Sequence, residues 1–505
     1  MKSSIMKRSI LFILTLIAFV SACSCSENEK PVPDPGDKFE RYTTDLSIDS
    51  KILGRKVKYS ITLPKSYIAD KERRYPVVYM LHGYGDDNNS WNGNWLHGND
   101  KIFSLEGSGL SDMIYVFPQG FTTYYCNFYT GAFNYMDMFI QELIPYIDAT
   151  YRTIADREHR SITGYSMGGF GAMALALKHP ETFICSAPLS MSFRTDDQYK
   201  AESQSGWDKQ WGDIFGGKGQ DGDGRITSYY MEHCPFYQFV PENKAALEKV
   251  HWFFTCGDDE EQLLIANDTL HVQMRDCGIR HEFRVGDGAH TSKYWLAALG
   301  EVLPMFDYYM NGGTQWPGIE ETHNVPEVEL QQSGAFISER YNSVTEGKTV
   351  MLLAHAGLDQ NKVKTLTRAM CKEYSLKPYA ILPMDVSTGT IAETVAETIH
   401  GYDYETLCVM AVGDAGIPVF ADRHLFNNLY FVEAKLGTVP TSLDGEQKYC
   451  FCCTDDSASY RDFGALYRAC KRSGANFEYR VINSVSDADT DIVNCIFTLH
   501  NTFFY

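Results

Sequence analysis

One stretch of the sequence, residues 163–169, constrains the fold more than any other. It reads Thr-Gly-Tyr-Ser-Met-Gly-Gly, ends a short apolar run and precedes the small and apolar residues 170–177. This pattern predicts a buried strand, a sharp turn and a helix, with Gly-x-Ser-x-Gly at the turn. The turn strains the serine backbone, and each flanking glycine omits a Cβ that would clash. We therefore expect Ser166 at the tip, with the N–H of Met167 at a helix N-terminus that favours negative charge.

Length and charge bound the domain organisation and the partners. At 505 residues the chain is longer than one ordinary domain, so two or more are expected. The net charge of −20 argues against a nucleic-acid partner. The 14 cysteines are scattered and predict buried apolar positions rather than disulfides. Cys450, Cys452 and Cys453 lack a second cluster of ligating residues, so neither a metal nor a cofactor is expected.

The N-terminus has the composition of a targeting segment. A basic stretch at residues 2–8 precedes the apolar residues 10–20, a run too short for a comfortable membrane span. Residues 20–23, Val-Ser-Ala-Cys, resemble the bacterial lipobox, which implies a signal peptide over 1–22 and lipid on Cys23. The alternative is ordinary secretion with cleavage near Ala22. We expect an extracytoplasmic lipoprotein, held at the (outer) membrane through its lipid alone, with residues 23–38 as a Pro-rich tether.

Residues 39–312 alternate strand-like and helical segments, as an α/β fold requires. The continuous apolar run 75–81 predicts a buried central strand. It ends in a Gly-rich turn, His82-Gly83-Tyr84-Gly85, at the strand end where α/β sheets form their ligand crevice. Gly83 or Tyr84 can therefore supply a second N–H donor beside Met167. His82 is not preferred as a base, because a better-placed histidine follows.

Two later strands end in the residue types that complete a catalytic set. Residues 250–256 lead into an acidic turn with Asp259 and Glu260, and residues 281–285 lead into a turn that ends at His290. A histidine can take the serine proton while a carboxylate holds its tautomer and stabilises its charged form. The order Ser166, acid, His290, each after a strand, is that of the α/β-hydrolase triad.

Residues 191–248 interrupt this alternation with many aromatic and polar residues. We interpret them as a lid or binding wall over the site; the alternative is a surface insertion whose aromatics pack on the body. Asp221 and Asp223 lie in a segment that partly resembles a calcium-binding loop. Gly219 and Tyr230 occupy positions that should be acidic, so calcium is not favoured.

Five segments together resemble the esterase D-type family, which includes feruloyl esterases, acetyl xylan esterases, S-formylglutathione hydrolase and mycolyltransferases. The segments are residues 79–85, 142–147, 164–172, 254–259 and 288–291. The resemblance implies an α/β-hydrolase fold with a mostly parallel sheet flanked by helices. It also implies Ser166 as nucleophile, His290 as base, and Met167 with Gly83 or Tyr84 as oxyanion donors. The family's acid is usually Asp at the position of Glu260, so Asp259 stays an alternative and Glu260 is favoured narrowly.

After a linker over 313–345, residues 346–505 repeat parts of this plan. Residues 451–456 lie 197 positions after residues 254–259, and 478–481 lie 196 after 282–285. The chemistry does not recur: Ala415, Ser457 and Ser486 occupy the positions expected for serine, acid and histidine. We predict a second, smaller α/β domain that is a degenerate, non-catalytic hydrolase-like copy. The alternative is an unrelated α/β domain.

These features predict a serine carboxylesterase that acts on feruloyl or acetyl esters of plant polysaccharides or oligosaccharides, with an acylated carbohydrate as partner. Within the same family the site could instead transfer acyl groups or hydrolyse a siderophore or peptide ester. In a different class, the protein could be a surface glycan-binding protein with a vestigial site.

Overall fold

The computed structural model describes residues 40–319, 323–371, 377–443 and 446–503. The predicted signal peptide 1–22, the lipidation site Cys23 and the tether 23–38 lie outside these residues. Within the described ranges, no helix combines the length and the apolar character that a membrane crossing requires.

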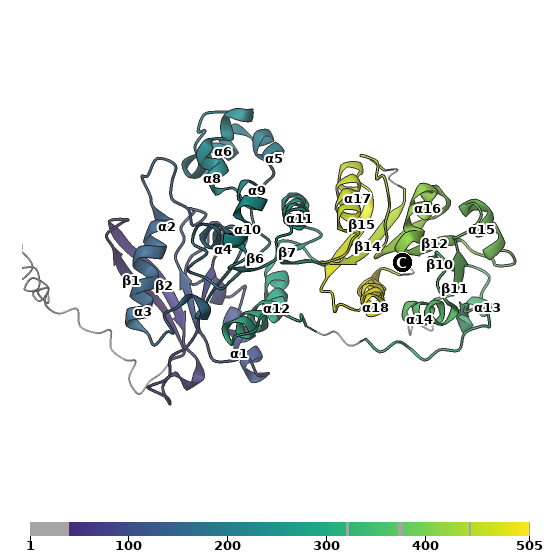
Figure 1. The fold of residues 1–505 in the computed structure, drawn as a ribbon, viewed down its shortest axis with the longest axis horizontal. Helices are drawn as coiled ribbons and strands as arrows, with labels where there is room; N and C mark the ends of the chain where they lie inside the picture. The colour runs from purple at the N-terminus through teal and green to yellow at the C-terminus, as the bar shows by residue number, and fades with distance from the viewer. Residues whose placement is uncertain (1–39, 320–322, 372–376, 444–445, 504–505) are drawn as a thin grey trace, which may run out of the picture. The chain divides into compact units, whose positions relative to one another are not determined.

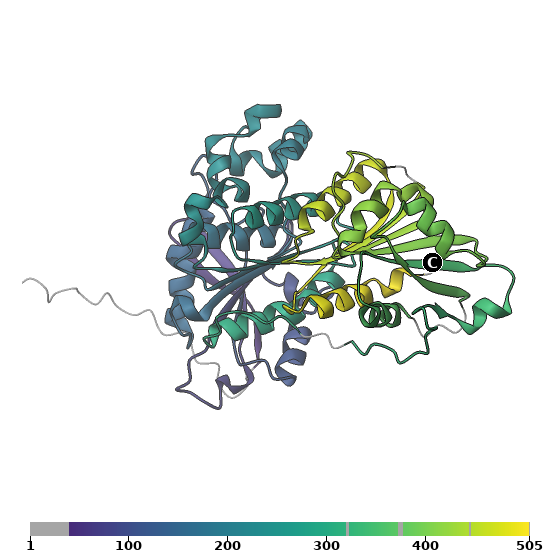
Figure 2. The ribbon, with the colours of Figure 1, turned by 45° about the vertical axis from the view of Figure 1, so that its right-hand side comes forward.

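The described chain builds one sheet of 15 strands, in the spatial order β1-β2-β4-β3-β5-β6-β7-β8-β15-β14-β13-β12-β10-β11-β9. Figure 2 shows the ribbon of the two halves that share this sheet. Strands β3 to β8 pair in parallel, and β1 and β2 add an antiparallel edge. The strands of this first half are β1 Tyr42–Ser50, β2 Arg55–Thr62, β3 Val77–Leu81, β4 Ile114–Pro118, β5 Arg160–Tyr165, β6 Cys185–Leu189, β7 His251–Gly257 and β8 Glu282–Gly286.

Helices cover both faces of this half (Figure 1), which is why β3 to β6 are buried along their whole length. Helices α4 and α11 lie on one face, and α1 and α12 lie on the other. Between β4 and β5, helices α2 and α3 are joined by a π-helical turn. The α-helices of this half, outside the insertion, are α1 Gly98–Gly107, α2 Tyr135–Met138, α3 Ile144–Thr150, α4 Met167–Lys178, α11 Glu261–Asp276 and α12 Ser292–Met310.

The insertion 191–248 is helical rather than irregular. Its aromatic side chains Trp207, Trp211 and Phe215 are buried, and Trp211 lies 4.2 Å from Tyr124 between ring centroids. These aromatics therefore fill a local core, as in the alternative of a packed surface insertion. Its helices are α5 Asp196–Ala201, α6 Gln204–Gln210, α7 Gly212–Phe215, α8 Ser228–His233, α9 Pro235–Gln238 and α10 Lys244–Leu247.

The second half of the sheet has the same strand order as the first. The order β11-β10-β12-β13-β14-β15 matches β4-β3-β5-β6-β7-β8, without a counterpart of the insertion. Its strands are β9 Phe336–Ile337, β10 Thr349–His355, β11 Tyr379–Asp385, β12 Thr406–Val412, β13 Asn428–Val432, β14 Lys448–Thr454 and β15 Asn476–Ile482. Its α-helices are α13 Glu339–Ser343, α14 Gln360–Met370, α15 Ile391–Thr398, α16 Gly416–Ala421, α17 Tyr460–Ser473 and α18 Ala488–Thr498.

The predicted linker 313–345 is partly structured. Its residues Phe336–Ile337 form β9 and pair with β11, and the Ser338 side chain caps α13. The two halves join where β8 runs antiparallel to β15, with Val285 opposite Val481. The sheet thus continues through the junction.

Candidate active site

Ser166 stands between β5 and α4 in the strained backbone that its motif predicts. Its φ is 58° and its ψ is −118°, a conformation that costs a non-glycine residue of order 1–3 kcal/mol. A Cβ on Gly164 would lie 2.5 Å from the Gly168 carbonyl oxygen, and one on Gly168 would lie 2.3 Å from that of Leu81. Both positions therefore require glycine, because backbone atoms cannot move aside.

The structure brings Ser166, His290 and Glu260 into one hydrogen-bonded chain. The His290 Nε2 lies 2.9 Å from the Ser166 Oγ, and its Nδ1 lies 2.7 Å from the Glu260 Oε2. The Glu260 side chain is fully buried, whereas His290 is 38% exposed. Asp259 is exposed, and its N–H donates to the Gly288 carbonyl. Such a chain can move the serine proton to the imidazole while the carboxylate fixes the tautomer.

Two residues hold the Glu260 carboxylate: Gly257, which lies within the motif 254–259, and Ser190, which no motif includes. Its Oε1 accepts hydrogen bonds from the Gly257 N–H at 2.9 Å and from the Ser190 hydroxyl. Ser190 follows β6 with a φ of 47°, and its Oγ accepts from the Trp295 Nε1 at 2.8 Å. Ser190 stands at the carboxyl end of a parallel strand, the one sequence signal that could have singled it out.

The turn after β3 lies beside the Ser166 elbow, as the Gly168 contact with the end of β3 requires. Among the described residues, the backbone N–H groups of Met167 and Tyr84 donate to no protein acceptor. Gly83 lies in the same turn as Tyr84. His82 supports this turn from within the core. Its Nδ1 donates to the Gly83 carbonyl at 2.8 Å, and its Nε2 accepts from the Gly120 N–H at 2.8 Å. Burial lowers the pKa of His82, which keeps it neutral.

Aromatic side chains pack against Tyr165 and His290, the residues next to Ser166 in sequence and in the hydrogen-bonded chain. Trp295 stacks on Tyr165 at 4.4 Å between ring centroids and meets the His290 ring edge-on at 4.9 Å. Trp95 packs its edge against both Tyr165 and Trp295 but stays 46% exposed. Tyr84, in the turn after β3, is 37% exposed. The rim of the site therefore offers flat apolar surfaces to solvent.

The turn after β12 is the counterpart of the elbow. The Lys435 N–H donates to the Gly413 carbonyl at 3.2 Å, just as the Ser192 N–H donates to the Ser166 carbonyl at 3.0 Å. Gly413 also has a φ of 60°. The structural counterpart of Ser166 is thus Gly413, and the sequence comparison that put Ala415 there was displaced by two residues.

A buried carboxylate and hydroxyl also recur in the second half, but in exchanged places. Glu433 follows β13 with a φ of 46°, where Ser190 follows β6 with a φ of 47°. The Ser457 hydroxyl donates to Glu433, whereas the Ser190 hydroxyl donates to Glu260. Ser486, 196 positions after the histidine of the first half, is exposed. No imidazole of the described chain hydrogen-bonds to Glu433.

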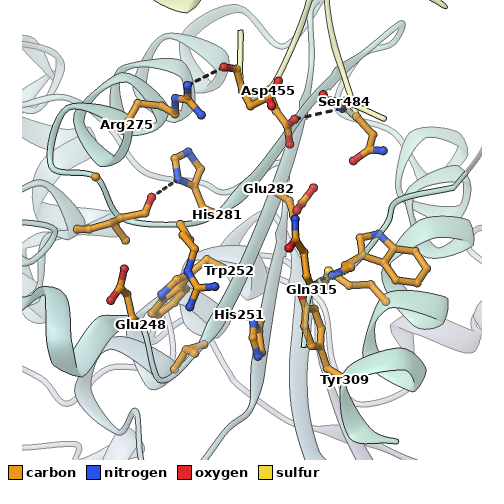
Figure 3. Close-up of a pocket in the computed structure, with 18 of the residues that line it drawn as sticks. Glu248, His251, Trp252, Arg275, His281, Glu282, Tyr309, Gln315, Asp455 and Ser484 are labelled. Atoms are coloured by element: carbon orange, nitrogen blue, oxygen red, sulfur yellow. Dashed lines mark hydrogen bonds between the residues drawn. The ribbon is translucent and has the colours of Figure 1, made fainter. Parts of the chain in front are cut away.

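A cavity of about 490 Å³ lies elsewhere, at the junction of the two halves (Figure 3). It lies at the carboxyl ends of β14 and β15 and the amino ends of β7 and β8. Arg275 donates to the Asp456 carbonyl at 2.7 Å across it, and Trp316 and Tyr309 border it. None of Ser166, Glu260 and His290 lines it, and these residues follow the carboxyl ends of β5, β7 and β8, so the cavity is separate from the Ser166 site.

Asp258, Asp259 and Asp287 form the single group of metal-capable side chains found among the described residues, with ligand atoms within 4.8 Å of one another. Arg480 forms ion pairs with Asp258 and Asp287, so its single positive charge offsets part of this negative charge. Burial raises the pKa of Asp258 to about 6, and Arg480 opposes the shift.

In the segment that partly resembles a calcium-binding loop, the exposed Asp223 forms an ion pair with Lys200 at 2.7 Å, and Asp221 is also exposed. The cysteines that the structure describes are all free, and all but Cys277 are buried. Cys450, Cys452 and Cys453 are buried on β14.

The family model described as "Putative esterase" matches residues 50–306, which is half of the chain. An "Endo-1,4-beta-xylanase/feruloyl esterase" of Xylanibacter ruminicola is 31% identical over 166 residues, 30% of this chain and 23% of that protein. An esterase of Mycobacterium tuberculosis is 26% identical over 246 residues, 46% of this chain and 52% of that protein. The chain thus spans about half or less of the length of these relatives.

Among solved structures, a ferulic acid esterase is 32% identical, with a TM-score of 0.44 over 53% of this chain and 98% of that one. The family model's match over residues 50–306, together with the elbow at Ser166 and the mostly parallel sheet, identifies the chain as a member of the esterase family of α/β-hydrolases.

Proposed function

We propose that the protein is a serine carboxylesterase that hydrolyses feruloyl or acetyl esters on plant polysaccharides or oligosaccharides. The observation that carries this proposal is the hydrogen-bonded chain from Ser166 Oγ through His290 to the buried Glu260. Glu260 is the acid of this proposal, because it contacts the imidazole and the exposed Asp259 does not.

In the proposed reaction, the Ser166 Oγ attacks the ester carbonyl carbon as His290 Nε2 takes its proton. The Met167 N–H and an N–H from Gly83 or Tyr84 stabilise the oxyanion. Collapse expels the alcohol, which receives that proton from His290, and leaves an acyl-enzyme. Water then attacks the acyl carbonyl, with His290 as general base, and releases the acid and free Ser166.

The exposed rings of Trp95 and Tyr84 support an aromatic acyl group as substrate. A ferulate ring could stack or pack edge-on against such surfaces. The name of the Xylanibacter ruminicola relative includes feruloyl esterase activity, which agrees with this choice. An acetyl group would use less of the apolar rim.

The direct test assays the full chain on methyl ferulate, an aryl acetate and acetylated xylan, beside Ser166→Ala. We expect hydrolysis by the wild type, with the higher kcat/KM on the feruloyl ester, and a loss of at least about 10³-fold in the variant. Hydrolysis that survives in Ser166→Ala would refute the mechanism. Assays with sugar acceptors would reveal acyl transfer as a new ester product.

We propose that the second half is a degenerate, non-catalytic copy of the first. The shared strand order and the exchanged Glu433–Ser457 pair support this.

For the N-terminus we propose lipid attachment at Cys23. Metabolic labelling with a fatty-acid probe should mark the wild type and not Cys23→Ala, and labelling of both would contradict the assignment.

A further inference from the structure

The two halves exchange buried ion pairs across the β8–β15 junction. Arg284 on β8 reaches the Asp455 carboxylate of the second half at 2.5 Å. Arg480 on β15 reaches the Asp258 carboxylate of the first half. All four side chains are at most about a tenth exposed. A buried charge that loses its partner is costly, so these pairs hold their loops firmly.

The Arg480 guanidinium touches two loops of the Ser166 site at once. Its Nη1 donates to the Asp258 Oδ2, and its Nη2 lies 3.3 Å from the Asp287 Oδ1. Asp258 precedes Glu260 by two residues, and Asp287 precedes His290 by three. Because Asp287 is mostly exposed, we expect the Asp258 contact to dominate.

Asp258 passes this constraint to both loops. Its Oδ1 accepts from the Gly288 N–H at 3.3 Å, and its own N–H donates to the Gly286 carbonyl at 3.1 Å. The neighbouring Asp259 N–H donates to the Gly288 carbonyl at 3.0 Å. The acid loop and the histidine loop are therefore tied together at the carboxylate that Arg480 binds.

The equivalent Arg284–Asp455 pair ties together two loops of the second half in the same way, since the Asp455 N–H donates to the Ile482 carbonyl at 2.9 Å. Asp455 lies in the loop after β14, and its Oδ1 accepts from the Ser484 N–H at 3.4 Å. The loop after β14 leads to Ser457 and the loop after β15 leads to Ser486, where the first half has an acid and a histidine. The same chemistry therefore occurs twice in one junction, once beside the triad and once away from it.

We propose that Arg480, supplied by the half that has no serine nucleophile, is a positioning residue for the Ser166–His290–Glu260 site. It fixes the distance between the Glu260 and His290 loops through Asp258. The inference rests on the proposed function, in which His290 and Glu260 act on Ser166.

The test compares Arg480→Gln with Asp455→Asn in the full chain, since each removes one buried Arg–Asp pair from the junction. The readouts are kcat and KM on an aryl acetate, the rate at which a fluorophosphonate labels Ser166, and the thermal midpoint. We expect Arg480→Gln to lower kcat and the labelling rate about tenfold with little change in KM, because small displacements of catalytic groups are costly. Asp455→Asn should lower the midpoint comparably and leave both rates unchanged.

Arg480→Lys provides a second variant if Arg480→Gln fails to fold. A lysine keeps the charge but not the planar fork that reaches two loops, so we expect a loss of several-fold in kcat. Wild-type rates in either folded variant, or equal losses in Asp455→Asn, would overturn the inference. Failure of the wild type to react with fluorophosphonate would instead refute the proposed function.

Discussion

The turns after β5 and β12 have nearly the same φ but carry different residues. Ser166 has a φ of 58° and Gly413 a φ of 60°. Glycine adopts this conformation without strain, whereas serine does not. The fold therefore requires the turn but not the serine. The strain at Ser166 is retained for what its hydroxyl does.

The exchanged carboxylate extends the comparison. Both halves bury one carboxylate against one hydroxyl, as Glu260 with Ser190 and as Glu433 with Ser457. We infer that this carboxylate–hydroxyl pair stabilises the loops at the carboxyl ends of the strands in both halves. Among the described residues, the carboxylate of the first half contacts the imidazole of the proposed triad, because Glu260 stands on the loop after β7 and reaches His290, whereas no imidazole contacts Glu433.

The strongest test of the comparison places glycine, the residue at position 413 of the second half, at position 166 of the first. We expect Ser166→Gly to lower kcat by at least about 10⁴-fold, because the nucleophile is lost. The same change should raise the free energy of unfolding by about 1 kcal/mol, because it removes the strain. Ester kinetics and chemical unfolding measure both effects. A less stable Ser166→Gly variant would show that the strain assignment is wrong.

The second prediction separates the two buried carboxylates. Glu260→Gln should lower kcat by about 10³-fold to 10⁴-fold, because the imidazolium loses its charged partner. The matched variant Glu433→Gln should leave kcat unchanged. Steady-state kinetics on one aryl ester compares them directly, and a loss of activity in Glu433→Gln would mean that the second half acts in catalysis.

The third prediction concerns backbone strain in the second half. A Cβ on Gly413 would meet no atom within 4 Å, so Gly413→Ala introduces only the cost of a positive φ. We expect the free energy of unfolding to fall by about 1 kcal/mol and kcat to stay unchanged. Chemical unfolding monitored by fluorescence measures the first, and an unaltered stability would mean that the turn relaxes.

The smallest expected effect is a pH dependence. Burial raises the pKa of Glu433. The stability that this group contributes is thus fully present below its unfolded pKa of about 4.3 and is lost as the pH rises through its higher folded value. Glu433→Gln has no such loss. The thermal midpoint of the variant, relative to that of the wild type, should therefore rise as the pH rises above about 4.3. A constant difference would contradict the shift.

Much of this arrangement was predictable because its signals are local. Continuous apolar runs predicted the central strands, and the residues after each strand end predicted Ser166 and His290. The choice between Glu260 and Asp259 was not local. It depends on how the acid loop binds the Gly288 backbone and the Asp258 side chain.

The remaining features depend on contacts between distant segments. Trp295 reaches Ser190 across 105 positions, and Arg480 reaches Asp258 across 222. No periodicity or motif encodes such pairs. The alignment of Ala415 with the serine was wrong because it matched a similar motif, whereas the counterpart is fixed by backbone conformation and the hydrogen bond to Gly413.

The pairing of Val285 with Val481 has a further consequence. The two residues are 196 positions apart, the spacing that relates residues 478–481 to 282–285, so a position faces its own counterpart across the junction. Only a two-fold axis gives this arrangement, and it is the hallmark of an isologous homodimer. The junction within this single chain therefore has the symmetry of an isologous dimer interface. The second half is placed against the first as one subunit of such a dimer is placed against its partner.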